Sequence, residues 1–234
     1  MLNNKVVLIT NDDGIQNIGL YLLTKEAYKY TKNIYVVAPQ TEQSAVSHKL
    51  SIRSGVTYKE CEPLYEDVKT YSVDGTPADC ISFAVVKLGI KPDIVLSGVN
   101  NGLNLGNDIL YSGTVAACFE ACLCGIKSIA FSTERGEQEA IKHFDYILEV
   151  IQNDPKLKDR KILNVNIPLE IKGYKVTHQG LNPFDTYFEL IDGRYYSVGK
   201  PLGKNIQQSS DTDIICYHDG YISITPLTID RTEW

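Results

Sequence analysis

Two adjacent carboxylates follow a short apolar run near the start of the sequence. Asp12 and Asp13 come directly after the strand-like run of residues 5–10, and Gly14 follows them. Neighbouring side chains of a strand point to opposite faces, so the two carboxylates can hold one ion only where the backbone turns, as Gly14 permits. In a crevice the two negative charges would repel each other unless a cation kept both ionised. The pair therefore indicates a metal site, and a turn that only caps the next helix is the alternative.

Further oxygen donors lie in two later polar segments. Ser44 follows the expected strand of residues 33–38, and Asn100 follows the expected strand of residues 93–97. Carboxylate, hydroxyl and amide oxygens favour Mg²⁺, Mn²⁺ or Ca²⁺ over zinc. Because parallel strands place their carboxyl ends on one edge of a sheet, Ser44 and Asn100 are suitable further ligands. His48, in the same segment as Ser44, could reach a bound substrate.

The segment of residues 111–117 opens a helix with small residues and hydroxyls. Backbone N–H groups at a helix N-terminus attract anions, so the segment is typical of a phosphate cradle with Ser112 and Thr114 as donors. The alternative is that one of these hydroxyls is only the helix cap. The glycine-rich loop of residues 98–108 has neither P-loop nor dinucleotide-binding spacing, which argues against a motor or a kinase.

Apolar runs of strand length alternate with helical segments, which predicts a doubly wound, mostly parallel α/β sheet. The expected strands are 5–10, 33–38, a short one near 50–52, 93–97, 128–132 and 162–167, and the expected helices include 81–88, 114–124 and 137–153. Thr76 and Asp79 form a capping box at a helix start. Strand-like residues 187–190 and 195–198 flank Asp192 and Gly193, which predicts a hairpin that packs on the body or on another subunit.

Composition limits the possible partners. The formal net charge of −6 argues against sequence-independent binding to a nucleic-acid polymer, which needs clustered lysine and arginine. No apolar run reaches the ~18 residues of a membrane helix and no signal peptide is evident, so we expect a cytoplasmic protein with no membrane partner. The six cysteines form no metal-binding motif. The 234 residues fit a single α/β domain, with a core of about 1–170 and a C-terminal hairpin and helix region of about 171–234.

Five segments together resemble the survival protein SurE family of nucleotidases. In order they are NDDG, VAPQTEQSAVSHKL, DGTPADC, SGVNNGLNLGNDILYSGTVAA and GYISITPL, within residues 6–227. The resemblance implies a three-layer Rossmann-like fold and a metal-dependent phosphatase that hydrolyses nucleoside 5′- and 3′-monophosphates. It also implies a homodimer or homotetramer in which the C-terminal hairpin is exchanged between subunits.

The resemblance also implies roles for individual residues. It places one divalent cation per subunit, Mg²⁺ or Mn²⁺, on Asp12, Asp13, Ser44 and Asn100. It places the phosphate on Asn104, Ser112, Gly113 and Thr114. Many relatives have a basic residue where this chain has Gln43, a departure that bears on the choice of nucleotide base.

The expected reaction is attack of water on a phosphomonoester. Asp12 and Asp13 would be the catalytic carboxylates, holding the cation while one of them also accepts a proton. A covalent aspartyl-phosphate route ranks lower, because the sequence lacks the DxDx[TV] spacing that such a route uses. A non-catalytic, metal-dependent nucleotide sensor and a phosphatase or exopolyphosphatase of broader specificity are further alternatives.

Overall fold

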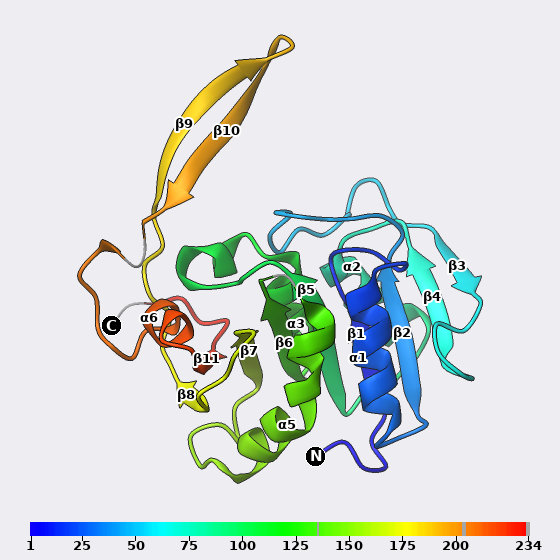
Figure 1. The fold of residues 1–234 in the computed structure, drawn as a ribbon. Helices are drawn as coiled ribbons and strands as arrows, with labels where there is room; N and C mark the ends of the chain where they lie inside the picture. Colours follow the sequence, from blue (N-terminus) through cyan, green and yellow to red (C-terminus); the bar gives the residue numbers. More distant parts are fainter. Residues whose placement is uncertain (135, 203–204, 233–234) are drawn as a thin grey trace.

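The computed structural model describes residues 1–134, 136–202 and 205–232, and in these residues nine strands form one mixed sheet (Figure 1). The strand order is β3-β4-β2-β1-β5-β6-β7-β11-β8, and the strands from β4 to β7 in this order run parallel. β3 is antiparallel to β4, β11 is antiparallel to β7, and β8 is parallel to β11. The strands are β1 (Val7–Thr10), β2 (Ile34–Pro39), β3 (Tyr58–Cys61), β4 (Lys69–Val73), β5 (Ile94–Asn101), β6 (Lys127–Thr133), β7 (Ile162–Ile167), β8 (Tyr174–Val176) and β11 (Ile222–Leu227).

Helices cover both faces of this sheet. One face packs against α1 (Ile18–Tyr28), α4 (Glu137–Ala140) and α5 (Phe144–Asn153), and the other against α2 (Pro77–Ser82) and α3 (Gly113–Leu123). Ile9 of β1 belongs to the first core cluster and its neighbour Leu8 to the second, because successive side chains alternate across a strand. The structure therefore confirms the three-layer α/β fold. The other helical segments are η1 (Phe83–Lys87), η2 (Gly106–Leu110), η3 (Ile141–His143) and α6 (Asp213–His218).

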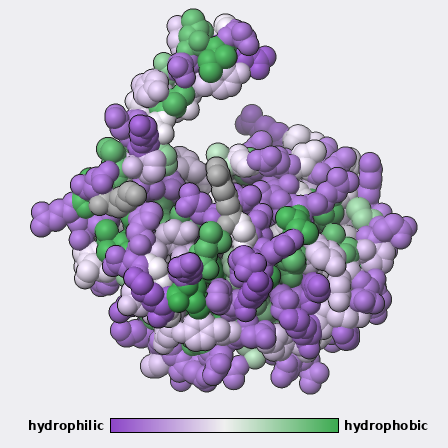
Figure 2. All heavy atoms as spheres, in the orientation of Figure 1, coloured by the Kyte–Doolittle hydropathy of each residue, from purple (hydrophilic) through white to green (hydrophobic). Residues whose placement is uncertain are grey.

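A two-stranded hairpin of β9 (Phe184–Ile191) and β10 (Arg194–Pro201) projects from the body (Figure 1). Asp192 and Gly193 both have positive φ, 48° and 78°, as a type I′ turn requires. The predicted hairpin is confirmed, and its strands are longer than predicted. Exposed apolar side chains lie along this arm (Figure 2). They are Phe184, Tyr187, Phe188, Leu190, Ile191, Tyr195 and Tyr196.

Some expected elements are wrong in type or extent. Residues 50–52 form no strand, because the Ser51 N–H donates to Asp79 Oδ1 (2.9 Å) at the start of α2, and Ile52 is 84% exposed. The helix expected over 137–153 is divided into α4, η3 and α5, because His143 leaves helical geometry at φ −90° and ψ 4°. The predicted capping box at the start of α2 is present. No helix in the described part of the chain is long and apolar enough to cross a membrane.

Candidate active site

Asp12 and Asp13 lie at the carboxyl end of β1, and the other predicted metal ligands reach them from neighbouring strands. Ser44 comes from the loop after β2, and Asn100 comes from the end of β5. Because β2, β1 and β5 are adjacent and parallel, their carboxyl ends share one edge of the sheet. The cavity that these four side chains line measures about 280 Å³. Its lining also includes the predicted phosphate-binding residues Asn104 and Ser112.

The N-terminus of α3 holds Asp12. Thr114 donates its hydroxyl proton to Asp12 Oδ1, and backbone groups of Gly113 and Thr114 also hydrogen-bond to this carboxylate. Asp12 is only 5% exposed, so burial raises its pKa while these hydrogen bonds oppose the rise. The positive end of the α3 dipole thus stabilises a buried carboxylate. The Thr114 hydroxyl, which we expected to bind phosphate, donates to Asp12 instead.

Asp13 has a buried carboxylate oxygen, Oδ2, with no hydrogen-bond partner among the described residues. Burial and the charge of Asp12 raise the pKa of Asp13 to about 6, and the more distant carboxylates of Glu42 and Glu137 add to this. A hydrogen bond from the Asn101 backbone opposes the rise. Buried polar atoms of native proteins are nearly always paired, so an unpartnered anionic oxygen indicates a missing partner. A cation at this oxygen would satisfy it and offset the repulsion from Asp12.

The two neutral candidate ligands present oxygens beside these carboxylates. Ser44 donates its hydroxyl proton to Glu42 Oε1 (2.6 Å), which leaves lone pairs of Ser44 Oγ for a cation. Asn100 donates through Nδ2 to the carbonyl of Gly102 (2.8 Å), so Oδ1 is the end suited to a cation. In the described residues no three His, Cys, Asp or Glu side chains are placed so that they could hold one metal ion. The donor set is therefore two carboxylates with a hydroxyl and an amide, which fits a hard divalent cation.

Asn104 and Ser112 both retain a donor for an anion. Asn104 Nδ2 donates to Ser132 Oγ (2.7 Å), and the Asn104 N–H donates to Asn166 Oδ1 (2.9 Å). A side-chain amide carries two N–H bonds, so Asn104 can donate once more. Ser112 Oγ accepts from the N–H of Val115 (3.1 Å) as the cap of α3. The cap uses a lone pair of the hydroxyl, so the proton of Ser112 can still bind an anion.

The loop that carries Ser44 is tied to the body on the α3 side. The Ser47 N–H donates to Tyr111 O (2.9 Å), and Ser47 Oγ donates to Leu110 O (2.7 Å). His48 Nε2 lies 2.9 Å from Glu120 Oε2 on α3. His48, which we expected near the substrate, therefore joins the Ser44 loop to the helix that holds Asp12.

Three ionisable residues that line the cavity were not predicted as site residues: Glu42, Asp108 and Tyr111. Burial raises the pKa of Asp108. Each of the three stands within four residues of Ser44 or Ser112 in the sequence. Proximity to those two serines was the signal that could have identified them.

The raised pKa of Asp13 predicts a pH dependence. In the metal-free protein this carboxyl should take up a proton as the pH falls through about 6, whereas the model value for an unfolded chain is 3.8. Because the folded state binds the proton more tightly, protonation of Asp13 adds to the free energy of unfolding as the pH falls between these values. A cation must displace the proton, so Mn²⁺ affinity should fall about tenfold per pH unit below pH 6. Calorimetric titration with Mn²⁺ at several pH values measures this, and an affinity independent of pH would contradict it.

Comparison with known proteins agrees with the motifs in the sequence. A family model described as survival protein SurE matches residues 7–186. The 5′-nucleotidase SurE of Natranaerobius thermophilus is 38% identical, and that of Thermoanaerobacter sp. is 40% identical, each over 97% of this chain and 94% of the relative. The crystal structure of the SurE protein from Aquifex aeolicus matches with a TM-score of 0.78 and 37% identity, over 97% of this chain and 94% of that one. The chain therefore belongs to the survival protein SurE family.

Proposed function

We propose that the protein hydrolyses nucleoside 5′-monophosphates, and also 3′-monophosphates, to nucleoside and inorganic phosphate. The relatives that are named 5′-nucleotidase support the substrate class. The observation that carries the proposal is Oδ2 of Asp13, which has no hydrogen-bond partner in the described part of the chain and lies beside Asp12 at the N-terminus of α3. This arrangement offers a place for a cation next to a place for a phosphate.

The proposed cofactor is one divalent cation per subunit, Mg²⁺ or Mn²⁺. Asp12 and Asp13 would be its charged ligands, and Ser44 and Asn100 its neutral ones. When bound, the cation would neutralise phosphate charge and lower the pKa of a water molecule. Glu42 accepts the hydroxyl proton of Ser44 and so orients its oxygen.

The phosphate would be held by donors that the fold leaves available. Asn104 offers an amide N–H and Ser112 a hydroxyl, both at the wall of the cavity. Gly113 places the backbone at the helix N-terminus, where the dipole favours an anion. We assign Thr114 a positioning role, because its hydroxyl holds Asp12.

Proton transfer is assigned to Asp13. The attacking water must lose a proton, and a carboxylate that lies beside the bound cation can accept it. Asp12 is less suited to this task because Thr114 and the α3 backbone already bind its carboxylate.

The deciding experiment measures binding and phosphate release together. Purified protein with Mn²⁺ or Mg²⁺ is given nucleoside 5′- and 3′-monophosphates and polyphosphate, and a chelator provides the metal-free control. We expect phosphate release from the nucleotides that is lost with the chelator. Nucleotide that binds without cleavage would show a sensor. Trapping of a phosphorylated aspartate by borohydride reduction during turnover would show an aspartyl-phosphate route.

We further propose that the hairpin joins subunits into a homodimer or homotetramer. Its apolar side chains are exposed along both strands, and a lone hairpin gains little stability in water. Phe188 and Leu190 of β9 are 67% and 58% exposed and lie on the same face of the strand.

Replacing both Phe188 and Leu190 by serine is therefore expected to reduce the oligomer to monomers. Sedimentation velocity checks the assembly state. Replacing Asp185 and Glu189 by serine on the same strand is the control, and it should leave the oligomer intact. An identical sedimentation profile for the apolar double variant and the native protein would show that the hairpin is not an assembly element.

A further inference from the structure

The loop after β5 separates the active-site cavity from a second cavity. Asn104 lines the active-site cavity, whereas its neighbours Leu103 and Leu105 line the second one. Leu105 has extended backbone geometry, with φ −114° and ψ 146°, and successive side chains of extended backbone point to opposite sides. Gly102 and Asp108 line both cavities, so the two spaces adjoin on either side of this loop.

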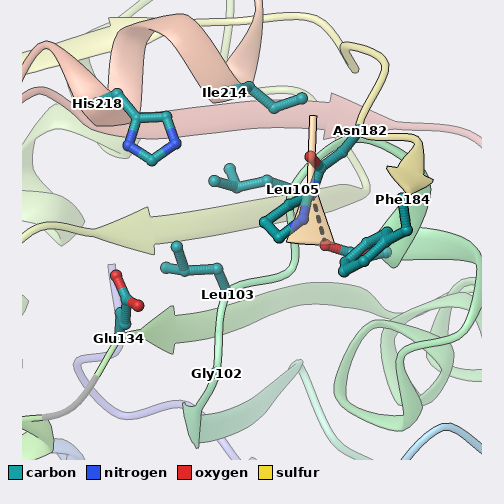
Figure 3. A pocket seen from close by; sticks show the side chains of 10 residues that line it. Gly102, Leu103, Leu105, Glu134, Asn182, Phe184, Ile214 and His218 are labelled. Carbon is teal, nitrogen blue, oxygen red and sulfur yellow. Dashed lines mark hydrogen bonds between the residues drawn. The ribbon is translucent and has the colours of Figure 1, made fainter. Parts of the chain in front are cut away.

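The second cavity measures about 410 Å³, and apolar groups form about half of its walls (Figure 3). Leu105 and Ile214 are 3% and 2% exposed, and they form one hydrophobic cluster with Leu103 and Tyr217. Phe184, at the start of β9, forms another wall. Phe184 is 45% exposed, so part of its side chain is accessible to a ligand.

Polar groups form the rest of the walls. Glu134 follows the end of β6, Asn182 lies just before β9, and His218 ends α6. Asn182 Nδ2 donates to Asp108 Oδ2 (3.0 Å), which is the dashed line in Figure 3, so this amide is held in place. Apolar walls with a small number of oriented polar groups are typical of pockets for small organic ligands.

We propose that the second cavity binds the nucleoside part of the substrate, with the base stacked on Phe184. The inference rests on the proposed nucleotidase function, which places the phosphate at Asn104 and Ser112 in the adjoining cavity. One nucleotide would then cross the loop that separates the cavities, with its phosphate on the polar side and its base on the apolar side. Stacking on an aromatic ring suits every base, and the carboxylate of Glu134 accepts from bases that carry amino groups.

A third cavity, of about 620 Å³, is the competing place for the nucleoside. It lies between the active site and the hairpin, and Thr186, Ser197 and Gly199 contribute to its lining. Phe184 lines this cavity as well as the second one, so Ser197→Trp, and not Phe184→Ala, distinguishes the two places. These hairpin residues are polar or small and are exposed. The second cavity is favoured because Leu105 and Ile214 give it a buried apolar wall, where a base loses more contact with water.

The test compares a substrate that has a base with one that has none. The ratio of kcat/KM for AMP to kcat/KM for ribose 5-phosphate is measured for the native protein and for Phe184→Ala, Phe184→Tyr, Thr186→Ala and Ser197→Trp. Alanine at Phe184 should lower this ratio about tenfold, mainly through KM for AMP, since loss of stacking weakens binding of the base. Phe184→Tyr keeps an aromatic ring, so its ratio should equal that of the native protein. Thr186→Ala removes a side chain two residues along β9, and Ser197→Trp fills the third cavity, and both should leave the ratio as it is.

The outcomes separate this inference from the proposed function. A native protein that releases phosphate from neither substrate would overturn the proposed function. A native protein that cleaves both, with a ratio that Phe184→Ala does not alter, would overturn only the nucleoside subsite. A drop in the ratio for Ser197→Trp as large as that for Phe184→Ala would place the base in the third cavity. It would also overturn the proposed nucleoside subsite in the second cavity.

Discussion

Asp13→Asn is expected to lower kcat/KM by more than about a hundredfold and to weaken Mn²⁺ binding in parallel. Asparagine keeps the shape of the side chain and removes the charge that the cation needs at Oδ2. Loss of a group that only orients a metal ligand already costs 10- to 100-fold in many enzymes, so about a hundredfold is a lower bound for a ligand itself. Mn²⁺ titration and phosphate release, measured on the same preparation, check this result.

The same substitution is expected to stabilise the metal-free protein. Burial and Asp12 raise the pKa of Asp13 to about 6, so at neutral pH the ionised carboxylate opposes folding. Removing this charge should raise the free energy of unfolding by about 1 kcal/mol, a figure reduced to allow for solvent screening. Thermal unfolding with and without Mn²⁺ should therefore show a higher Tm for the metal-free variant and a smaller gain from the metal.

An exposed aspartate provides the matched control for Asp13→Asn. Asp159→Asn removes the same charge at an exposed position and should change neither turnover nor metal affinity. An Asp13→Asn variant that bound Mn²⁺ as tightly as the native protein would contradict the ligand role. A metal-free variant less stable than the metal-free native protein would contradict the conclusion that the ionised Asp13 carboxylate opposes folding.

Gly113→Ala is expected to lower kcat/KM at least about tenfold, because the new methyl group would meet the Asp12 side chain. A Cβ at Gly113 would lie 2.8 Å from Asp12 Cβ, 3.0 Å from Asp12 Oδ2 and 3.2 Å from Pro77 Cγ. Either the carboxylate or the start of α3 must then move, and the hydrogen bond from the Thr114 hydroxyl to Asp12 would be distorted. A misplacement of about 1 Å can cost as much as a hundredfold in rate.

The free energy of unfolding gives a second readout for Gly113→Ala. We expect it to fall, whereas replacing glycine by alanine in a helix usually raises it. Alanine in a helix is ordinarily more stable than glycine by about 1 kcal/mol. Overpacking a tight site costs about 1–3 kcal/mol, so the variant should unfold at lower denaturant concentration than the native protein. An increase in stability would show that α3 does not press on Asp12.

Gly125→Ala, just beyond the other end of α3, is the control. A Cβ there meets no atom within 4 Å, but φ is +79°, which an alanine adopts with difficulty. This variant should lose about 1 kcal/mol of stability and keep its turnover. Equal losses of turnover in the two glycine variants would mean that the effect at Gly113 comes from reduced stability and not from Asp12.

Much of the fold and of the candidate site could be predicted, because the signals are local. Asp12 and Asp13 stand directly after an apolar run, and Ser112 stands at the start of a helix. Parallel strands joined by helices place such positions on one edge of a sheet, whatever the details of packing. The Asp192-Gly193 turn was predictable for the same reason, since positive φ at two successive residues is a property of the turn itself.

The roles within the site could not be predicted, because they depend on residues far apart in the chain. Thr114 meets Asp12 across 102 positions, and His48 meets Glu120 across 72. In the sequence, the hydroxyls of Ser112 and Thr114 are equally good candidates to bind an anion. Only the packing of α3 against the end of β1 brings the Thr114 hydroxyl into a hydrogen bond with Asp12. The strand expected at residues 50–52 is absent for a similar reason, because the Ser51 N–H donates to the side chain of Asp79 on α2.

The sequence by itself determined most of the parallel strands and the helices between them, the edge of the sheet where the polar loops gather, and the family of the protein. Hydrophobic periodicity, turn residues and motif spacing are short-range properties, so they can be read before any packing is known. Only the tertiary structure decided that Asp13 has a buried oxygen without a partner among the residues that the structure describes, and that the loop after β5 has a cavity on each side. Burial and cavities arise where distant segments pack together, and no local pattern determines how closely they approach.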